Sequence, residues 1–531
     1  MSDCGGAISG KVIRNTLYNT LGRFWGVIIA LFLTPYIISH LGIERYGVWA
    51  FVSALIGYFG LLDFGVSASF VRYIAEFNAK KDCRSINELV NTGFVFYSLF
   101  GLAIFLLAVN YLPPLVGFFK IPSGLMDEAM FVFLTGIFIF MFSNAISPFS
   151  AIPSGLQRMD VQNGLSIALS LPNVAGTIFV LEKGYGLKGL MVSTLCVFLL
   201  SAIASVVIAF RLIPGLEFKP FSFCKRKMMV CLFNFGSRFQ LARISGAVTA
   251  QTDKMLITYF LTVGMVTFYQ LGNSLVSYSA SIAYLLVAAL MPAFTEIATT
   301  GGREMLVEAY FRSMKYLVFV IVPIFFFLVL AAPQIIFMWI GLGYGQSVAI
   351  ARILAAGLLL NTLAQVAVSV CVAIDKPGLV AKASLIIIFL GVCLSFIFIR
   401  LFGFTGVAWG SAIAVNIGTS FFLYRLHGEL KIANRKMARL ALPFFYSAAG
   451  AYGIAWLAET FFFHAGGSPT RLAVLGLLSF KFVIFCCIYV AGVLYARVFD
   501  DYEKNLVMQR FPFLVRLTGR RAPAAEKTDA L

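Results

Sequence analysis

The sequence predicts an all-α protein that crosses a membrane about fourteen times. Two observations support this fold class. Of the 531 residues, 60% are hydrophobic and 12% are charged, which is more apolar than a water-soluble core requires. Apolar runs of roughly 20 residues, the length that a helix needs to span a bilayer, also follow one another along nearly the whole chain. Short loops separate these runs, so no water-soluble domain is expected.

The first apolar run follows the polar residues 1–14 and is too long for the core of a cleavable signal peptide. We therefore expect it to remain as an uncleaved signal anchor. The expected spans, in chain order, are 15–38, 46–69, 89–111, 129–149, 162–181, 188–210, 229–252, 265–291, 313–332, 347–373, 378–400, 404–424, 440–463 and 472–496.

Lys and Arg gather in alternate loops, which indicates the orientation. With the N-terminus in the cytoplasm, most of the 41 basic residues fall on the cytoplasmic side, as the positive-inside rule requires. Both termini are then cytoplasmic. The net charge of +18 is best explained by contact with anionic lipid headgroups, because the basic residues border helices and form no separate nucleic-acid-binding domain. The main clusters are 72–84, 211–227, 425–439 and 497–527.

The largest internal loop predicted on the cytoplasmic side, 211–228, divides the chain. We expect an N-terminal six-helix lobe at 1–210, this linker, and a C-terminal six-helix lobe at 229–426. An additional helix pair at 427–496 and a basic tail at 497–531 follow. The two lobes show weak similarity without gaps, which aligns Arg23 with Arg243 and Trp49 with Tyr269. Parallel repeats of this kind are a known transporter plan, with the ligand site between the halves.

Motifs of enzymes and metal sites are missing from the sequence. The nine cysteines include no CxxC pair, the three histidines are dispersed, and no HExxH, GxSxG or P-loop spacing occurs. The longest outer loop, about 112–128, is too short for a catalytic domain. A membrane glycan polymerase or ligase is therefore a remote alternative, and we expect neither an enzyme nor a bound cofactor.

Two segments resemble a known family. The stretch at 19–76 contains LGIERYGVW followed by GLLDFGVSASFVRYIAE, and the stretch at 252–275 reads TDKMLITYFLTVGMVTFYQLGNSL. Together with MPAF at 291–294, they resemble the polysaccharide flippases of the multidrug/oligosaccharidyl-lipid/polysaccharide exporter superfamily. These motifs are more specific for the superfamily than for its substrate.

The resemblance implies two six-helix lobes in a V shape, working by alternating access. It implies that the cargo is an O-antigen-type oligosaccharide on undecaprenyl pyrophosphate, flipped from the inner to the outer leaflet of the bacterial cytoplasmic membrane for surface polysaccharide biosynthesis. The polysaccharide polymerase and chain-length machinery are implied partners. Two alternatives stay within the superfamily. The first is a cation-coupled multidrug antiporter. Such antiporters commonly carry an acidic residue in helix one for cation coupling, and the absence of one between Lys11 and His40 argues against this alternative. The second is a lipid II flippase, because the helix pair 13–14 resembles that of the lipid II flippases.

Three arginines are expected inside the membrane, where a charge is costly and therefore points to function. Arg23 lies in the first helix of one lobe, and Arg238 and Arg243 lie in the first helix of the other. Asn19 is one helical turn from Arg23 and extends a polar stripe. Because guanidinium forms a planar fork toward phosphate oxygens, we expect these groups to bind the pyrophosphate, and interlobe packing or snorkelling is the alternative.

Three further charges are candidates. Asp63 lies in the Gly60–Gly65 break of helix two and is either a proton or Na⁺ coupling site or a structural cap. Asp253 is expected to form an interfacial anchor and salt bridge with Lys254, with ion coupling as the alternative. Export of an anion gains about 2.3 kcal/mol per charge per 100 mV, so coupling acids are not required for it.

Lys481 lies about ten residues into the last span, among apolar neighbours. It therefore needs a partner, for which Glu459 is the candidate, or a hydrated groove. Contact with the carrier's phosphate is the second interpretation.

Reporter fusions test the topology. Fusions at Pro122, Gly184 and Gly467 should report an outside location, and fusions at Lys81, Lys225 and Lys436 should report the cytoplasm, because basic loops stay inside. Alkaline phosphatase and green fluorescent protein activities measure the two sides. Reversal at two or more positions would show that the orientation is wrong.

Overall fold

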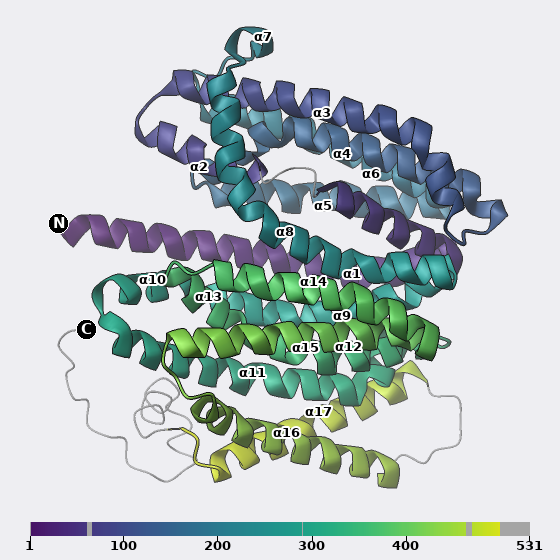
Figure 1. The fold of residues 1–531 in the computed structure, drawn as a ribbon. Helices are drawn as coiled ribbons and strands as arrows, with labels where there is room; N and C mark the ends of the chain where they lie inside the picture. The colour runs from purple at the N-terminus through teal and green to yellow at the C-terminus, as the bar shows by residue number, and fades with distance from the viewer. Residues whose placement is uncertain (1, 61–65, 289, 463–469, 500–531) are drawn as a thin grey trace.

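The computed structural model describes residues 2–60, 66–288, 290–462 and 470–499, and these residues form helices and connecting turns without a β-strand (Figure 1). The expected all-α fold is confirmed. Helices suit this chain because they satisfy the backbone hydrogen bonds of each segment internally, which an apolar solvent demands. The helices are α1 (Ser2–Phe59), α2 (Val66–Ala79), α3 (Cys83–Gly117), α4 (Met126–Gly155), α5 (Met159–Glu182), α6 (Gly186–Leu212), α7 (Pro220–Phe223), α8 (Arg226–Phe260), α9 (Val263–Ala288), α10 (Met291–Thr300), α11 (Gly302–Trp339), α12 (Gly345–Leu363), α13 (Gln365–Ala373), α14 (Gly378–Phe402), α15 (Phe404–Glu429), α16 (Asn434–Phe462) and α17 (Arg471–Tyr495), with a 3₁₀ turn at Ser123–Leu125.

Twelve stretches of the described chain are long and apolar enough to cross a membrane. The expected number was about fourteen. The difference has two sources. The first two expected spans are joined in α1, which forms one such stretch, Tyr18–Phe59. The run at 229–252 lies within α8, which is not among the twelve.

The joined helix α1 is sharply bent at Gly42. Its backbone angles there are φ 78° and ψ 173°, a conformation that L-amino acids with a Cβ rarely adopt. The bend turns the chain so that the segment after Gly42 starts back across the molecule. Close to the bend, Gly47 approaches α9 so closely that a Cβ on it would lie 2.2 Å from the carbonyl oxygen of Val263.

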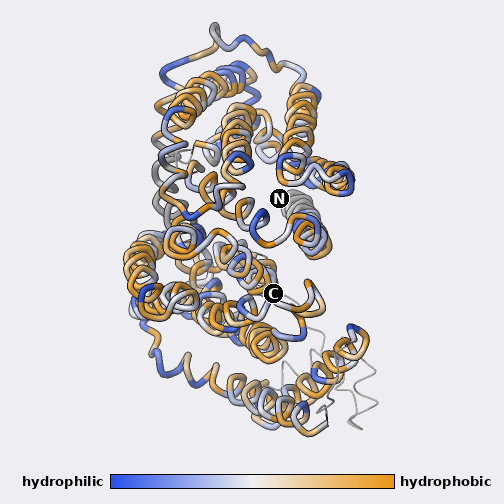
Figure 2. Tube along the Cα trace, turned by 90° about the vertical axis from the view of Figure 1, so that its right-hand side faces the viewer, coloured by the Kyte–Doolittle hydropathy of each residue, from blue (hydrophilic) through white to orange (hydrophobic). Residues whose placement is uncertain are grey.

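The helices form two stacked bundles with a separate pair at one edge (Figure 1). Helices α2 to α6 pack with one another, and α9 and α11 to α15 make the second bundle. Helices α16 and α17 pack together and against α11. Figure 2 shows hydrophobic residues along nearly every helix. Large apolar side chains such as Phe32, Leu99 and Phe389 are 65–78% exposed, as expected of a surface that contacts lipid.

Helix α8 belongs to both bundles. Near its start, Ser69 and Tyr73 of α2 donate hydrogen bonds to the carbonyls of Leu232 (2.9 Å) and Cys231 (3.4 Å). Its later part packs against α14, α15 and α9. The separation of the lobes at 211–228 stays a prediction, and α8 is the element that connects them in the structure.

The closest packing in the second bundle is between α14 and α15. Small residues recur every four positions along one face of α15, at Gly406, Gly410, Ala414 and Gly418. A Cβ on Gly406 would lie 2.0 Å from the Phe398 carbonyl oxygen of α14, so only glycine allows this approach. Such stripes let helices gain van der Waals contact where no hydrophobic effect drives association. This packing positions the serines of the buried cluster described below.

Candidate functional site

Arg23 lies where α1 of the first bundle meets α9 of the second. Its side chain is exposed, and its guanidinium carbon lies 5.7 Å from the ring centre of Tyr284 in α9. Among the described residues, no carboxylate forms an ion pair with it. Nineteen residues separate Arg23 from Gly42, or about 28 Å of helix, close to the thickness of the hydrocarbon core. With the Gly42 bend at one boundary of the membrane, Arg23 lies near the opposite boundary.

Asn19 is held by the first bundle. Its side-chain oxygen accepts a hydrogen bond of 2.8 Å from Asn163 of α5, which also donates to the Met159 carbonyl at 2.9 Å. The expected polar stripe is thus partly engaged in packing α1 on α5. The side-chain amide nitrogen of Asn19 is not used in this contact, and it lies on an exposed side chain one turn from Arg23.

Three candidates cannot be placed. Arg238 and Arg243 lie within α8, but their side chains are outside the described part of the molecule, and Asp63 lies outside the described residues altogether. Their proposed roles stay predictions.

Asp253 is buried in the second bundle, which corrects the expected interfacial anchor. Only 3% of it is exposed, because α8 continues to Phe260 and carries Asp253 between α9, α14 and α15. Its carboxylate accepts hydrogen bonds from Ser411 (2.6 and 2.8 Å), Ser395 (3.2 Å) and the Tyr269 hydroxyl. Ser395 also lies 3.2 Å from the Val407 carbonyl. One carboxylate thereby joins four helices through three hydroxyl groups.

The expected Asp253–Lys254 salt bridge does not form. The two residues are neighbours on one helix, so their side chains point in different directions. Lys254 donates instead to the Gln251 side chain at 3.1 Å. Asp253 and Ser411 also line a small pocket of about 10 Å³, which reaches between α8, α14 and α15.

Lys481 has the partner that the sequence predicted. Its ammonium lies 2.6 Å from Glu459 of α16, while Lys481 itself is 1% exposed. Glu459 also accepts a hydrogen bond of 2.8 Å from Gln334 of α11. The three side chains join α17, α16 and α11, and the ion pair compensates the charge of Lys481.

Sequence reasoning did not identify Tyr284, Asn163 or the hydroxyls around Asp253. Tyr269 was singled out only as the counterpart of Trp49 in the repeat. Ser411 lies among small residues and Ser395 among large apolar ones, as is usual in packed membrane helices, so no local signal distinguishes them.

Comparison with known proteins assigns this arrangement to a class. Residues 12–298 match the model of the polysaccharide biosynthesis protein family. The match covers more than half of the 531 residues, and the chain belongs to this family. Family membership and the twelve apolar stretches make the chain a multi-pass membrane protein, and its curated relatives are named as a transporter and a flippase.

Two curated relatives are named for glycan transport. A putative O-antigen transporter of Shigella flexneri is 24% identical over 377 residues, which is 70% of this chain and 87% of that protein. A probable low-salt glycan biosynthesis flippase of Haloferax volcanii is 22% identical over 286 residues, which is 52% of this chain and 57% of that protein.

Solved structures share the fold. The lipid II flippase MurJ in an inward closed conformation has a TM-score of 0.68 at 15% identity, covering 91% of this chain and 99% of that one. An inward-facing multidrug transporter of the MATE family in the MOP superfamily has a TM-score of 0.59 at 18% identity, covering 78% and 95%. These likenesses show that the predicted fold is shared with both transporters.

The Lys481–Glu459 pair predicts a strong coupling in stability. Glu459→Gln should lower stability by roughly 3–5 kcal/mol, because it leaves the buried ammonium of Lys481 without its counter-charge, and Lys481→Met should cost less, because Glu459 is partly exposed. The double variant should lose much less than the sum. Thermal unfolding in detergent measures all four proteins. An additive double variant would contradict the pairing, and Lys431→Gln, an exposed lysine, serves as the control.

Proposed function

We propose that this protein flips an undecaprenyl-pyrophosphate-linked oligosaccharide from the inner to the outer leaflet of the bacterial cytoplasmic membrane by alternating access, for surface polysaccharide biosynthesis. Family membership and the names of both curated relatives support a glycan cargo on a lipid. The cargo is moved without chemical change. The polysaccharide polymerase and chain-length machinery would then act on the delivered product.

The observation that carries this proposal is the environment of Arg23. A guanidinium inside a membrane protein normally has a nearby anion, and within the described residues Arg23 faces the Tyr284 ring instead of a carboxylate. The side chain is exposed at the junction of the two bundles. A pyrophosphate would supply the missing charge through paired N–H···O bonds, which guanidinium forms better than ammonium does.

The contacts between the bundles support loading from the cytoplasmic side. Near the Gly42 bend, Thr267 of α9 donates a hydrogen bond to the Ile43 carbonyl at 2.6 Å. Lys120 donates to the Phe260 carbonyl at 2.7 Å. In the predicted topology these contacts join α1 to α9 and residue 120 to α8 at the outer end, whereas at the inner end the described hydrogen bonds join α2 to the start of α8. A cargo would then enter from the opposite end, where Arg23 lies.

Lipid II is the second candidate cargo. The fold likeness to MurJ extends over 91% of this chain and 99% of that one. The two cargoes are distinguished by the lipid-linked glycan that accumulates on the inner leaflet when the protein is depleted. Accumulation of lipid II with intact surface polysaccharide would overturn the proposal.

We also propose that Asp253 couples transport to a proton or Na⁺. Its carboxylate and the oxygens of Ser395 and Ser411 are hard donors of the kind that Na⁺ accepts, and the same carboxylate can bind a proton. The group joins helices from α8 to α15, so a change in its charge would alter the packing of the second bundle. Coupling would drive the return of the transporter after it has released its cargo, since outward anion movement is already favoured by the membrane potential.

Replacement of Arg23 tests the cargo site. Arg23→Ala should abolish surface polysaccharide and leave completed lipid-linked oligosaccharide on the inner leaflet, because the pyrophosphate loses its partner. Arg23→Lys should retain partial function, since the charge remains without the planar fork. Arg243→Ala, at the matching position of the repeat, should behave like Arg23→Ala.

Surface polysaccharide is measured by gel analysis and protein level by immunoblotting. Arg158→Gln, which alters an exposed pair with Asp160, is the matched control. Loss of the folded protein would indicate a packing role for Arg23. Near-normal export by the Arg23→Ala and Arg243→Ala double variant would exclude the site.

Replacement of Asp253 tests the coupling. Asp253→Asn keeps the size of the side chain but cannot change charge, so the protein should fold while transport no longer responds to an imposed pH or Na⁺ gradient. Flipping of the lipid-linked oligosaccharide in reconstituted vesicles provides the measurement. Asp127→Asn, at an exposed helix start, is the control. An unchanged gradient response would show that Asp253 is structural only.

A further inference from the structure

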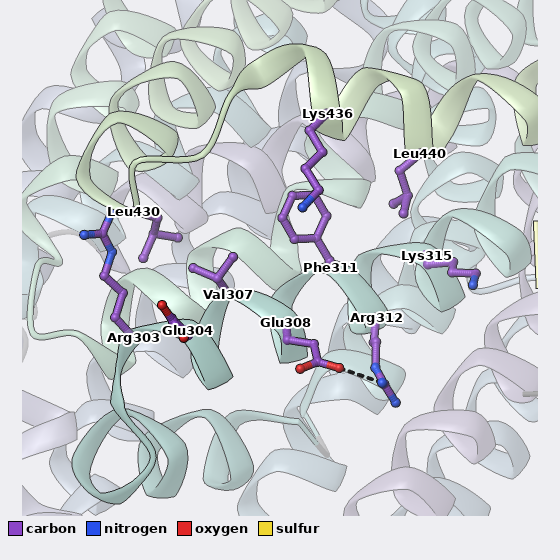
Figure 3. Close-up of a pocket in the computed structure, with 10 residues that line it drawn as sticks. All are labelled: Arg303, Glu304, Val307, Glu308, Phe311, Arg312, Lys315, Leu430, Lys436 and Leu440. Carbon is purple, nitrogen blue, oxygen red and sulfur yellow. Dashed lines mark hydrogen bonds and ion pairs between the residues drawn. The ribbon is translucent and has the colours of Figure 1, made fainter. Parts of the chain in front are cut away.

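A second charged region lies away from Arg23 and Asp253, between the start of α11 and the start of α16. It is a pocket of about 610 Å³ (Figure 3). Arg303 and Lys315 lie at its two ends, and Lys436 extends from α16 over the ring of Phe311. The Lys436 ammonium is 4.9 Å from the centre of that ring.

Positive charge dominates this pocket. Its lining includes four basic side chains, from Arg303, Arg312, Lys315 and Lys436, and two acidic ones, from Glu304 and Glu308. Glu308 already pairs with Arg312 at 2.6 Å. An anion placed in the pocket therefore meets an excess of positive charge, which Arg303 and Lys436 contribute from two different helices.

The length and charge pattern of α11 indicate that the pocket lies at the boundary between headgroups and hydrocarbon. With 38 residues, α11 is about 57 Å long, well beyond the roughly 30 Å of the hydrocarbon core. Its charged residues end at Lys315, and residues 316–332 are uncharged. The apolar part of the lining, Val307, Leu430 and Leu440, completes a surface with a polar side and an apolar side. A free anion would use only the polar side.

We propose that this pocket binds the phosphate headgroup of an anionic phospholipid. Arg303 and Lys436 provide charge-assisted hydrogen bonds to the phosphate, and the apolar lining contacts the glycerol and the upper acyl chain. Because the pocket lies between α11 and α16, the bound lipid helps to hold the α16–α17 pair against the second bundle. This site is independent of the proposed cargo, since neither Arg23 nor Asp253 takes part in it.

The test compares two variants that lose the same charge from the same region. Arg303→Gln with Lys436→Gln removes charges that line the pocket. Arg435→Gln with Arg439→Gln removes two exposed charges of the neighbouring helix face that do not line it. Full-length protein is reconstituted in mixtures of phosphatidylglycerol and phosphatidylcholine, extracted, and analysed by native mass spectrometry for retained lipid.

The wild-type protein should retain phosphatidylglycerol in preference to phosphatidylcholine. The pocket variant should lose about tenfold in this preference, and the control variant less than about threefold, because diffuse attraction to the surface is shared by both. Equal loss in both variants would overturn the proposal. If the pocket double variant fails to fold, Arg303→Gln alone provides the comparison, with a smaller loss expected in the same direction.

Inorganic phosphate identifies the source of the anion. At millimolar concentration it should displace little phosphatidylglycerol, because it cannot use the apolar lining. Complete displacement by inorganic phosphate would show that the pocket binds a free anion and would overturn the assignment to a lipid. Flipping of the proposed cargo is not part of this measurement, so either proposal can fail without the other.

Discussion

An apolar solvent constrains every part of this molecule. It forces the backbone into helices, because no water is available to hydrogen-bond a free N–H or C=O group. It also removes the hydrophobic effect as a force between helices, so close contact of small residues takes its place. The stripe from Gly406 to Gly418 on α15 meets that requirement, and it fixes the position of the buried serines beside Asp253.

The same solvent makes each internal charge informative. Lys481 is compensated by Glu459, and Asp253 by three hydroxyl groups on neighbouring helices. In both arrangements, groups of the protein itself interact with the charged side chain. Arg23 differs, because within the described residues it forms no ion pair and faces the ring of Tyr284, which attracts a cation more weakly than a carboxylate does. Its charge is therefore not neutralised by a carboxylate of the described residues.

Hydropathy predicted the helices well, because a span needs a minimum length of apolar chain that is visible in one dimension. All fourteen expected runs fall largely within helices of the structure, although the first two are continuous in α1 across the bend at Gly42. The partner of Lys481 was also predictable, since Glu459 is an isolated acid in the adjacent span. Few other groups could neutralise that lysine.

The environment of Asp253 could not be predicted in this way. Its sequence neighbour Lys254 suggested a local pair, whereas the groups that hold it lie 16, 142 and 158 residues away. Tertiary packing gave Asp253 these distant partners instead of Lys254, and hydropathy carries no information about which helices become neighbours. The aromatic partner of Arg23 was missed for the same reason, because Tyr284 lies in the other bundle.

The packing of α8 against both bundles affects the order in which the protein assembles during synthesis. Its first turns complete the packing of α2 and α3, and its last turns complete that of α14 and α15. During synthesis it emerges after α1 to α6 and long before α14, so it can dock on the N-terminal helices while its other end still lacks neighbours. Asp253 is then inserted before Ser395 and Ser411 have been synthesised. The hydrogen bonds of Asp253 to Ser395 and Ser411 can therefore form only after α14 and α15 have been made.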